Sequence, residues 1–290
     1  MLNKPENERN DAPVWVTGAG GLIGSYLVKT LSAKGIPVRG ITHREIELTN
    51  CGQVMDAFVK DHPAAVIHCA AISSSVICQQ NPGLARRVNV FTTRFLSDIA
   101  SDIPFFLFST DLVFDGKQGN YHPEDTVNPL SIYGETKAEA EQYILSNPRH
   151  TVIRTSLNGG ISPRGSRGFN EEIRNAWRAG KELCLFSDEY RCPIAAKLTA
   201  EIVTELLEQQ VAGIVHVAGG KRLSRYEIAT LLAGIYTDVK PLMREGSLRE
   251  YKGAPRAPDT SLDISQTEEL LGHPIPGLGE WLQQNPNEPF

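Results

Sequence analysis

The sequence lacks long apolar runs. A membrane-spanning helix needs roughly 20 consecutive apolar residues, whereas the longest apolar run, 64–72, is short, is interrupted by His68 and fits a buried strand. The N-terminal residues 1–11 are polar and lack the apolar segment of a secretory signal. We therefore expect no membrane partner, and we interpret residues 1–12 as a flexible N-terminal extension.

Cysteine and basic residues are also in short supply. The 5 cysteines are odd in number and form no C-x-x-C pair, which argues against a disulfide framework or a metal site and favours reduced thiols in a cytoplasmic protein. The net charge of −5 argues against a nucleic-acid partner, because such proteins carry a basic face. With 290 residues and 41% apolar composition, the chain can bury a large core, and a small-molecule substrate is the expected partner.

Short apolar runs rich in β-branched residues alternate with helical patterns in the first half of the chain. Strands are predicted at 14–17, 38–42, 65–69, 105–109 and 151–154, and helices at 22–33, 82–100 and 131–145. This alternation predicts parallel strands with helices on both faces. The nearly continuous apolar run 104–108 fits a sheet buried on both sides. The predicted fold class is therefore α/β, a Rossmann-type doubly wound parallel sheet.

After about residue 155 the pattern loosens into loops rich in Gly, Pro and Arg. Helices are predicted at 169–179, 195–207 and 226–235, with a strand at 214–217. We expect residues 13–155 to form a dinucleotide-binding domain and residues 156–290 mainly a smaller C-terminal substrate-binding cap, with some elements returning to the Rossmann core. Open sheets bind ligands at the carboxyl ends of their strands, so the cap should cover that edge.

The segment Thr17 to Gly24 follows the first predicted strand and opens the first helix, where a dinucleotide-binding loop belongs. Glycine permits a tight turn, and the helix N-terminus offers unpaired N–H groups and a partial positive charge to a pyrophosphate. The spacing G-x-x-G-x-x-G differs by one residue from G-x-G-x-x-G and resembles the short-chain dehydrogenase variant. The predicted cofactor-binding residues of this loop are Gly18, Gly21, Leu22, Ile23 and Gly24.

The residues after the second strand should set the cofactor preference. An acidic residue about 20 positions after the loop binds the ribose of NAD, whereas an arginine accommodates the 2′-phosphate of NADP. His43 and Arg44 favour NADP(H) over NAD(H). Glu45 would serve a ribose if the strand ended one residue later, so NAD stays an alternative.

Tyr133 and Lys137 stand four residues apart at the start of a predicted helix and therefore share one face. A phenol with a pKa of roughly 10 donates a proton poorly near neutrality, and a neighbouring ammonium brings it closer to its working range. Without other evidence, a solvent-exposed pair is the commoner interpretation. The apolar strand that ends at Thr110 favours the catalytic one, because a hydroxyl there can bind a substrate carbonyl. The alternative for Thr110 is a turn that caps the strand.

Together these residues resemble the extended short-chain dehydrogenase/reductase family, and within it the dTDP-4-dehydrorhamnose reductases. The matching segments are 17–24, 68–71, 88–90, 109–116, 128–137, 153–156 and 255–263. The resemblance implies that Thr110, Tyr133 and Lys137 form a catalytic triad. It also implies further cofactor-binding residues, which are Glu47, Leu48, Cys69, Ala70, Ala71, Asn89, Ser109, Tyr133 and Lys137. Of these, Glu47 and Leu48 would lie near the adenine.

Two positions depart from the reductase pattern, which has an aromatic residue where this chain has Leu112 and another where it has Leu157. Both lie toward the sugar side by the resemblance, and with Asp111 and Arg256 they are the predicted substrate residues. Leu112 also argues against a sugar 4,6-dehydratase, whose pattern places Glu at this position. The redox residues are thus kept while the sugar-binding surface differs.

The resemblance implies a reductase that moves hydride from NAD(P)H to a keto group, with a nucleotide-activated sugar as the expected substrate class. A homodimer is one possible assembly, and the sequence does not determine the oligomeric state. A sugar epimerase is the alternative within enzymes. The alternative from another class is a non-catalytic regulatory subunit, because the β subunit of methionine adenosyltransferase looks similar and keeps the Tyr-x-x-x-Lys pattern.

Overall fold

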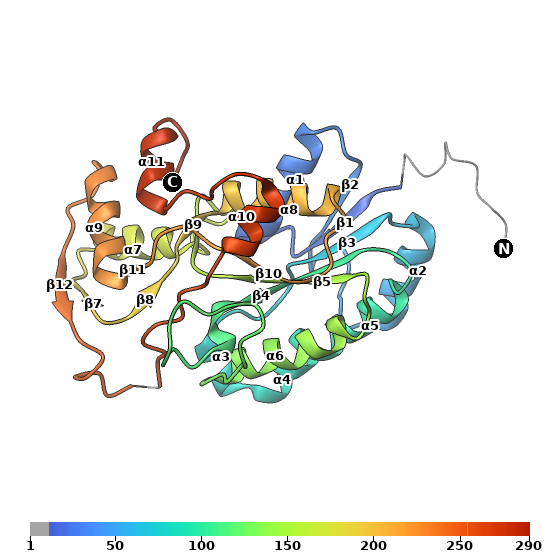
Figure 1. Cartoon of the computed structure of the whole chain (residues 1–290), viewed down its shortest axis with the longest axis horizontal. Coiled ribbons are helices and arrows are strands. Elements are labelled where there is room, and N and C mark those ends of the chain that lie inside the picture. The colour runs from blue at the N-terminus through green and yellow to red at the C-terminus, as the bar shows by residue number, and fades with distance from the viewer. Residues whose placement is uncertain (1–11, 254) are drawn as a thin grey trace.

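A computed structural model describes residues 12–253 and 255–290 and shows a central sheet with helices on both sides (Figure 1). The sheet has 6 strands, all parallel. Their spatial order is β2 (Val38–Ile41), β1 (Val14–Thr17), β3 (Ala65–His68), β4 (Phe105–Thr110), β5 (His150–Thr155) and β10 (Gly213–Val217). The predicted Rossmann-type α/β class is confirmed. The predicted N-terminal extension lies, except for residue 12, outside the described residues.

The strand order reverses at β1. The chain passes from β1 to β2 on one side and then crosses to β3 on the other side of β1. In open α/β sheets, ligands bind outside the carboxyl ends of the strands at such a reversal. The loops that follow β1 and β3 therefore flank the expected ligand position.

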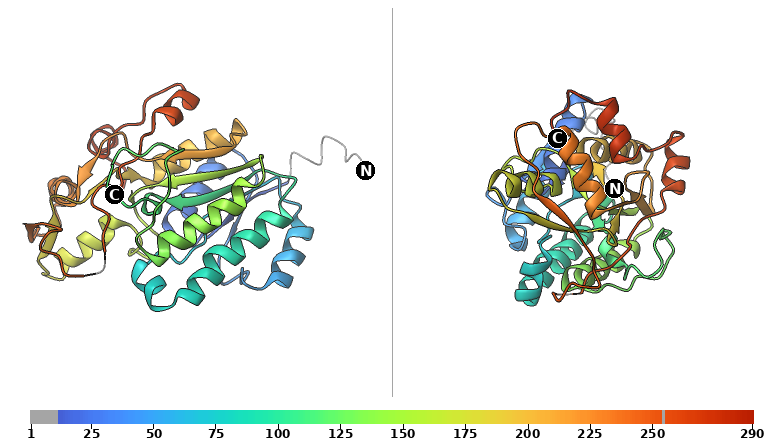
Figure 2. Two further views of the ribbon diagram at one scale, coloured as in Figure 1. Left: turned by 60° about the horizontal axis from the view of Figure 1, so that its bottom comes forward. Right: turned by 90° about the vertical axis from the view of Figure 1, so that its left-hand side faces the viewer.

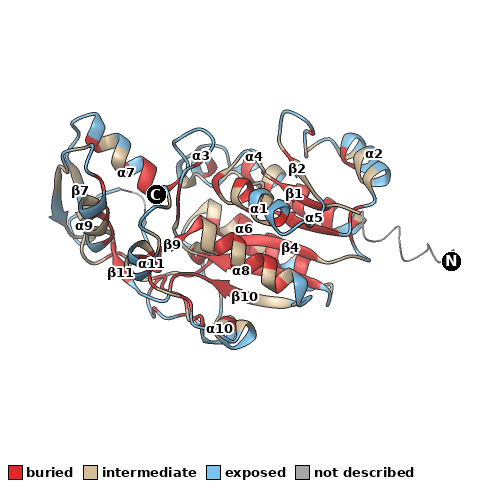
Figure 3. Cartoon of the chain, turned by 90° about the horizontal axis from the view of Figure 1, so that it is seen from above, coloured by how far each residue is buried: buried red, intermediate tan, exposed pale blue. Residues whose placement is uncertain are grey.

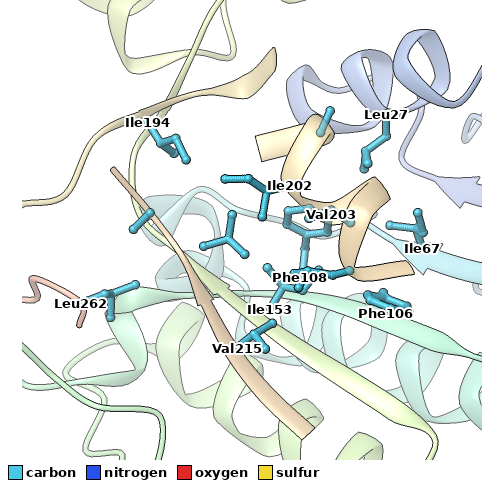
Figure 4. Packing of buried hydrophobic residues seen from close by; sticks show 14 of the residues in the cluster. Leu27, Ile67, Phe106, Phe108, Ile153, Ile194, Ile202, Val203, Val215 and Leu262 are labelled. Carbon is cyan, nitrogen blue, oxygen red and sulfur yellow. The ribbon is translucent and has the colours of Figure 1, made fainter. Parts of the chain in front are cut away.

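Helices cover both faces of the sheet (Figure 2). On one face lie α1 (Leu22–Ala33) and α8 (Ala196–Glu208), and on the other lie α2 (Cys51–Asp61), α5 (Thr92–Ile99) and α6 (Ile132–Leu145). Phe106 and Phe108 pack with the first pair of helices (Figure 4), whereas Phe105 and Leu107 pack on the opposite side. Successive strand residues alternate between faces, so a continuous apolar run fills both layers, as the sequence predicted.

The predicted helix at 82–100 is divided in the structure. It consists of α4 (Pro82–Arg86), a π-helical turn η2 (Arg87–Phe91) and α5, and α3 (Ser75–Gln80) precedes it. Such π turns occur mostly inside α-helices and often at functional sites. Here the turn carries the buried Asn89 toward its partners.

Beyond residue 155 the chain forms small paired strands and further helices, of which α7, α9 and α11 lie at the left of Figure 1 and α10 lies near its centre. The elements are β6 (Asn158–Gly159), α7 (Phe169–Arg178), β7 (Leu183–Phe186), β8 (Tyr190–Arg191), β9 (Ile194–Ala195), β11 (Leu223–Ser224), α9 (Arg225–Ile235), β12 (Met243–Gly246), α10 (Ser265–Leu271) and α11 (Leu278–Gln284). A separate core cluster lies among α7, α9 and α11. Buried residues line the central strands and the inner side of α8 (Figure 3).

Within the described part of the chain, no helix is both long and apolar enough to cross a membrane. The division of the chain at residue 155 stays a prediction.

Candidate active site

The site is built at the carboxyl edge of the sheet, where β4 ends at Thr110. The Thr110 hydroxyl accepts a hydrogen bond of 3.2 Å from the Leu112 N–H and thereby caps the short 3-10 turn η3 (Asp111–Val113). Thr110 therefore does cap a turn after the strand, which was the alternative to a catalytic role in the sequence analysis. It does not exclude a second role, because the hydroxyl proton of Thr110 is not used in this bond.

Helix α6 brings Tyr133 to Thr110. Ser131 caps the helix by accepting from the Gly134 N–H at 3.2 Å. A Cβ at position 134 would overlap the Leu112 carbonyl oxygen, so glycine allows the first turn of α6 to lie directly against η3. The phenol of Tyr133 then lies close enough to the Thr110 hydroxyl for that hydroxyl to lower the pKa of the phenol.

Lys137 lies one turn further along α6 and is only 1% exposed. The alternative of a solvent-exposed Tyr–Lys pair is therefore wrong for Lys137, whereas Tyr133 is half-buried. Burial lowers the pKa of Lys137 to about 8, while the Glu141 carboxylate opposes this shift. Burial raises the pKa of Tyr133 above its usual value, as does the charge of Asp111, whereas the contact with Thr110 lowers it.

Glu141 and Arg154 form a buried ion pair beside Lys137 that sequence reasoning missed. Glu141 is 3% exposed and accepts from Arg154 at 2.8 Å and 3.2 Å, as well as from the Ser109 hydroxyl. The pair ties α6 to β4 and β5. Glu141 stands four residues after Lys137 on the same helix face, and this spacing is the signal that could have indicated it.

The glycine loop has the geometry that a pyrophosphate requires. Gly18 adopts a φ of +71°, and a Cβ there would lie 2.8 Å from the Ala70 amide nitrogen. Gly21 is the N-cap of α1, and no side chain caps the helix. Its first-turn N–H groups therefore lack the partners that usually satisfy them and can bind an anion. Leu22, Ile23 and Gly24 form that first turn.

A chain of buried hydrogen bonds fixes the loops after β1 and β3. His68 Nδ1 lies 2.7 Å from the Thr17 hydroxyl, and His68 Nε2 lies 3.1 Å from the Thr93 hydroxyl. Thr93 donates to the Asn89 carbonyl at 2.7 Å, so its oxygen accepts from Nε2–H, and Nδ1 accepts from Thr17. The Ala70 N–H donates to the same Thr17 oxygen at 3.3 Å. His68 is thus held neutral in a single tautomer.

Asn89 connects this chain to α6. Its amide nitrogen donates to the Thr136 hydroxyl at 3.0 Å and to the Ile72 carbonyl at 3.2 Å, and its oxygen accepts from the Ile72 N–H at 2.8 Å. Burial raises the pKa of the Cys69 thiol, and the nearby Lys137 ammonium opposes this shift. Ala71 completes the half-buried loop between His68 and Ile72.

In the loop after β2, the acidic side chains form hydrogen bonds within the loop, whereas the basic side chains are exposed to solvent. Glu45 accepts from the Thr42 N–H at 2.9 Å and from the Thr42 hydroxyl at 2.7 Å. Glu47 accepts from the Thr49 N–H and hydroxyl at 3.1 Å and 2.9 Å. His43 and Arg44 are exposed. Leu48 packs against the core on the α2 side.

The predicted substrate residues have unequal surroundings. Asp111 is 4% exposed, and its Oδ2 accepts hydrogen bonds from Ser156 and Thr260. Arg256 forms two hydrogen bonds of 2.6 and 2.9 Å to Glu189. Leu112 is half-buried between Asp111 and Val113. Leu157 packs against the cluster formed by α7, α9 and α11. Sequence reasoning missed Glu189, which binds Arg256 from 67 positions away as well as its near neighbour Arg191.

The family description "RmlD substrate binding domain" matches residues 12–286. A Haloferax volcanii protein named "Probable low-salt glycan biosynthesis reductase" is 30% identical over 91% of this chain and 94% of its own length. The methionine adenosyltransferase 2 subunit beta of Xenopus laevis is 27% identical over 88% of this chain and 81% of its own length. The dTDP-4-dehydrorhamnose reductase of Aggregatibacter actinomycetemcomitans is 27% identical over 90% of this chain and 94% of its own length.

Among solved structures, dTDP-4-dehydrorhamnose reductase of Bacillus anthracis in complex with NADP superposes with a TM-score of 0.86. It is 22% identical, and the match covers 94% of this chain and 98% of that one. At this identity the likeness establishes the shared fold.

The neutral His68 makes the stability of the fold depend on pH. Burial, and then the charge of Lys137, lower the pKa of His68 from 6.5 to about 3. Between these pH values the unfolded chain binds a proton on His68 that the folded chain does not bind. The contribution of His68 to the free energy of unfolding is therefore fully present above pH 6.5 and is lost as the pH drops toward 3. Each such histidine contributes a slope of about 1.4 kcal/mol per pH unit.

Urea unfolding at pH 6 and pH 5 measures this slope. We expect the free energy of unfolding to fall less steeply in His68→Asn than in the wild type, by about 1.4 kcal/mol per pH unit. Equal slopes in the two proteins would contradict a buried neutral His68.

Proposed function

The chain belongs to the RmlD substrate binding domain family, and we propose that it is an NAD(P)H-dependent reductase acting on the keto group of a nucleotide-activated sugar. The observation that carries this function is the meeting of Thr110, Tyr133 and Lys137 at the carboxyl edge of the sheet, beside a glycine loop shaped for a pyrophosphate. The named reductases among its relatives support the same reaction class.

The cofactor-binding residues fit a dinucleotide. The uncapped first turn of α1 offers N–H groups to the pyrophosphate, and the loop 69–71 faces Gly18 at close range. When bound, the nicotinamide cofactor supplies the hydride. Lys137 would hold its ribose, and the His68 and Asn89 hydrogen bonds keep the surrounding loops in place.

Tyr133 supplies the proton in this proposal. The phenol is protonated at neutral pH, as a proton donor must be before the reaction. Burial raises its pKa, so the lowering that the sequence led us to expect from Lys137 is not observed in this structure. Thr110 donates a hydrogen bond to the substrate oxygen that gains charge. The positive charge of Lys137 stabilises the phenolate left after proton transfer. Because the pKa of Lys137 is about 8, its charge is retained at neutral pH.

Activity with a keto sugar tests the function directly. We expect the wild type to oxidise NADPH when dTDP-4-dehydrorhamnose is added. Tyr133→Phe should lower kcat at least about 100-fold, the usual contribution of a general acid, while still binding NADPH. Tyr143→Phe is the matched control, since this residue lies on α6 away from Thr110 and stacks under Arg94.

The alternatives give different results in the same experiment. An epimerase would convert a sugar without net oxidation of NADPH. A regulatory subunit, like the relative of that kind, would show no turnover alone and would co-purify with a catalytic partner. Retention of full activity in Tyr133→Phe would reject the assigned proton donor.

We further propose that NADP(H) is preferred over NAD(H). The acidic side chains that could bind a ribose, Glu45 and Glu47, are already occupied by hydrogen bonds from their own loop. Arg44 and His43 are exposed on the same loop and available to a 2′-phosphate. Arginine pairs with phosphate through directed, charge-assisted hydrogen bonds.

Arg44→Ala should therefore weaken NADPH binding selectively. A hydrogen bond to a charged group contributes about 1.5–3 kcal/mol, so the Kd for NADPH should rise about 10- to 100-fold with little change for NADH. Nicotinamide fluorescence titration measures both constants. Arg149→Ala is the control, because Arg149 is exposed at the opposite edge of the sheet. Equal weakening of both cofactors would argue against a 2′-phosphate contact.

The two-part organisation, residues 13–155 and 156–290, is retained as a proposal, supported by a core cluster whose members all follow residue 155. Leu112 and Leu157 are proposed to set the sugar preference, since the resemblance places them toward the sugar. A cytoplasmic location, predicted from the cysteine pattern, stays a prediction.

A homodimer is proposed through the outer side of α3, α4 and η2. Ile77, Leu84 and Phe91 are 46%, 48% and 50% exposed and recur every seventh residue. Arg86, Arg94 and Glu139 flank them with charges of both signs. A surface with both signs around an apolar centre can pair with a second copy of itself across a twofold axis.

Sedimentation equilibrium measures the assembly. We expect a dimer for the wild type and a monomer for Leu84→Glu, since a buried unpaired charge at the interface is costly. Leu270→Glu is the control, because Leu270 is 36% exposed on α10, away from this surface. A monomeric wild type would reject the proposal.

A further inference from the structure

Asp111 follows the proposed catalytic Thr110 and is bound by residues from three separate segments. Its Oδ2 accepts from the Ser156 hydroxyl at 2.7 Å and from the Thr260 hydroxyl at 3.0 Å. The Nε of Arg191 lies 3.7 Å from the same oxygen. We call these residues (Asp111, Ser156, Arg191 and Thr260) the Asp111 cluster. Every partner follows residue 155, whereas Asp111 directly follows strand β4.

The other carboxylate oxygen faces the Thr110 hydroxyl. Thr110 Oγ1 lies 3.3 Å from Asp111 Oδ1, beyond the 2.5–3.0 Å typical of an O–H···O hydrogen bond. The Leu112 N–H already occupies an acceptor position of the Thr110 oxygen. The single hydroxyl proton of Thr110 therefore has two possible directions, toward Asp111 or toward Tyr133 and a substrate oxygen.

We propose that Asp111 is a positioning residue through which the segments at Ser156, Arg191 and Thr260 orient the Thr110 hydroxyl for catalysis. The proposal rests on the proposed reductase function. It goes beyond a substrate contact for Asp111, because the carboxylate is 4% exposed and acts through Thr110.

The hydrogen bonds to Asp111 determine which way the Thr110 hydroxyl proton points. Ser156 and Thr260 donate to Oδ2, and Arg191 lies near the same oxygen, so the carboxylate is held mainly through Oδ2 and its contact with the Thr110 proton is long. Thr110 can then donate that proton to the substrate oxygen. If one of these donors is lost, the carboxylate draws the Thr110 proton toward itself, and a lone pair faces the substrate oxygen instead. That arrangement repels the developing negative charge.

The cluster continues into the region beyond β12. Arg191 also binds Glu189 at 3.1 Å, and Glu189 binds Arg256 at 2.6 Å. Glu189 and Arg191 are 1% and 5% exposed, whereas the Arg256 side chain at the other end of the row is 37% exposed to solvent. The groups that face Asp111 are Arg191 from β8, the phenol of Tyr133 from α6 and the thiol of Cys192. A substrate that moves Arg256 would thus affect the residues around Thr110.

Thr260→Val tests the cluster without touching a catalytic group. It removes one donor to Asp111 and keeps the size of a side chain that is fully buried. Thr267→Val is the matched control, because Thr267 is 1% exposed and its hydroxyl donates instead to the His216 carbonyl. Both variants lose one buried hydrogen bond, so their losses of stability should be similar.

Steady-state kinetics with NADPH and dTDP-4-dehydrorhamnose give the first readout. We expect Thr260→Val to lower kcat about tenfold, a change of about 1.4 kcal/mol in the barrier, with both KM values within about twofold of wild type. Thr267→Val should keep the wild-type kcat. Equal kcat values in the two variants, or a change confined to KM, would overturn the positioning role.

Hydrogen exchange gives a second readout that needs no turnover. The Leu112 N–H is bound to Thr110 and the Cys192 N–H is bound to Ser156, so both report on the cluster. Exchange in segments 110–114 and 190–193 should be faster in Thr260→Val and unchanged in Thr267→Val. An inactive wild type with this exchange pattern would reject the reductase function alone, whereas unchanged exchange in Thr260→Val would reject the cluster.

Discussion

The structure depends on a buried ammonium group. Lys137 lies on α6 with 1% of its surface exposed, and a buried charge is costly unless an opposite charge lies near it. Glu141 supplies that charge from the next turn of the same helix and is itself fixed by Arg154 and Ser109. These contacts hold α6 against β4 and β5, and so determine where Tyr133 stands relative to Thr110.

Hydrogen bonds join the rest of the carboxyl edge to this helix. His68 connects β1 to the π turn through Thr17 and Thr93, and Asn89 connects the same turn to Thr136 on α6. The glycine loop and helix α6 therefore belong to one hydrogen-bonded network. The Asp111 cluster attaches the later part of the chain to this network at the residue next to Thr110.

The sequence predicted the parts of the fold whose signals are local. Helix 22–33 and strand 14–17 have the predicted bounds, because an apolar strand, a glycine turn and a helix follow one another without interruption. The Tyr133–Lys137 pair could be found because both residues lie on one helix turn. The signal of the glycine loop is equally local, since its glycines stand within a few residues of β1.

The features that sequence reasoning missed depend on distant partners. Arg154 and Glu141 approach each other only because β5 lies beside α6 in the fold, and Glu189 meets Arg256 from 67 positions away. The π turn at Arg87–Phe91 interrupts a regular apolar pattern and leaves no sign in composition. The helix Cys51–Asp61 was also missed, although Asn50 caps it by accepting from the Gln53 N–H.

Transfer of deuterium tests the central claim most directly. The protein would be mixed with dTDP-4-dehydrorhamnose and NADPH carrying deuterium at the transferable position of nicotinamide C4, and the sugar product analysed by mass spectrometry and NMR after one turnover. The arrangement of Thr110, Tyr133 and Lys137 predicts one deuterium on the carbon that bore the keto oxygen. An unlabelled sugar, recovered while NADPH is demonstrably bound, would contradict the assignment of this chain as a keto-sugar reductase.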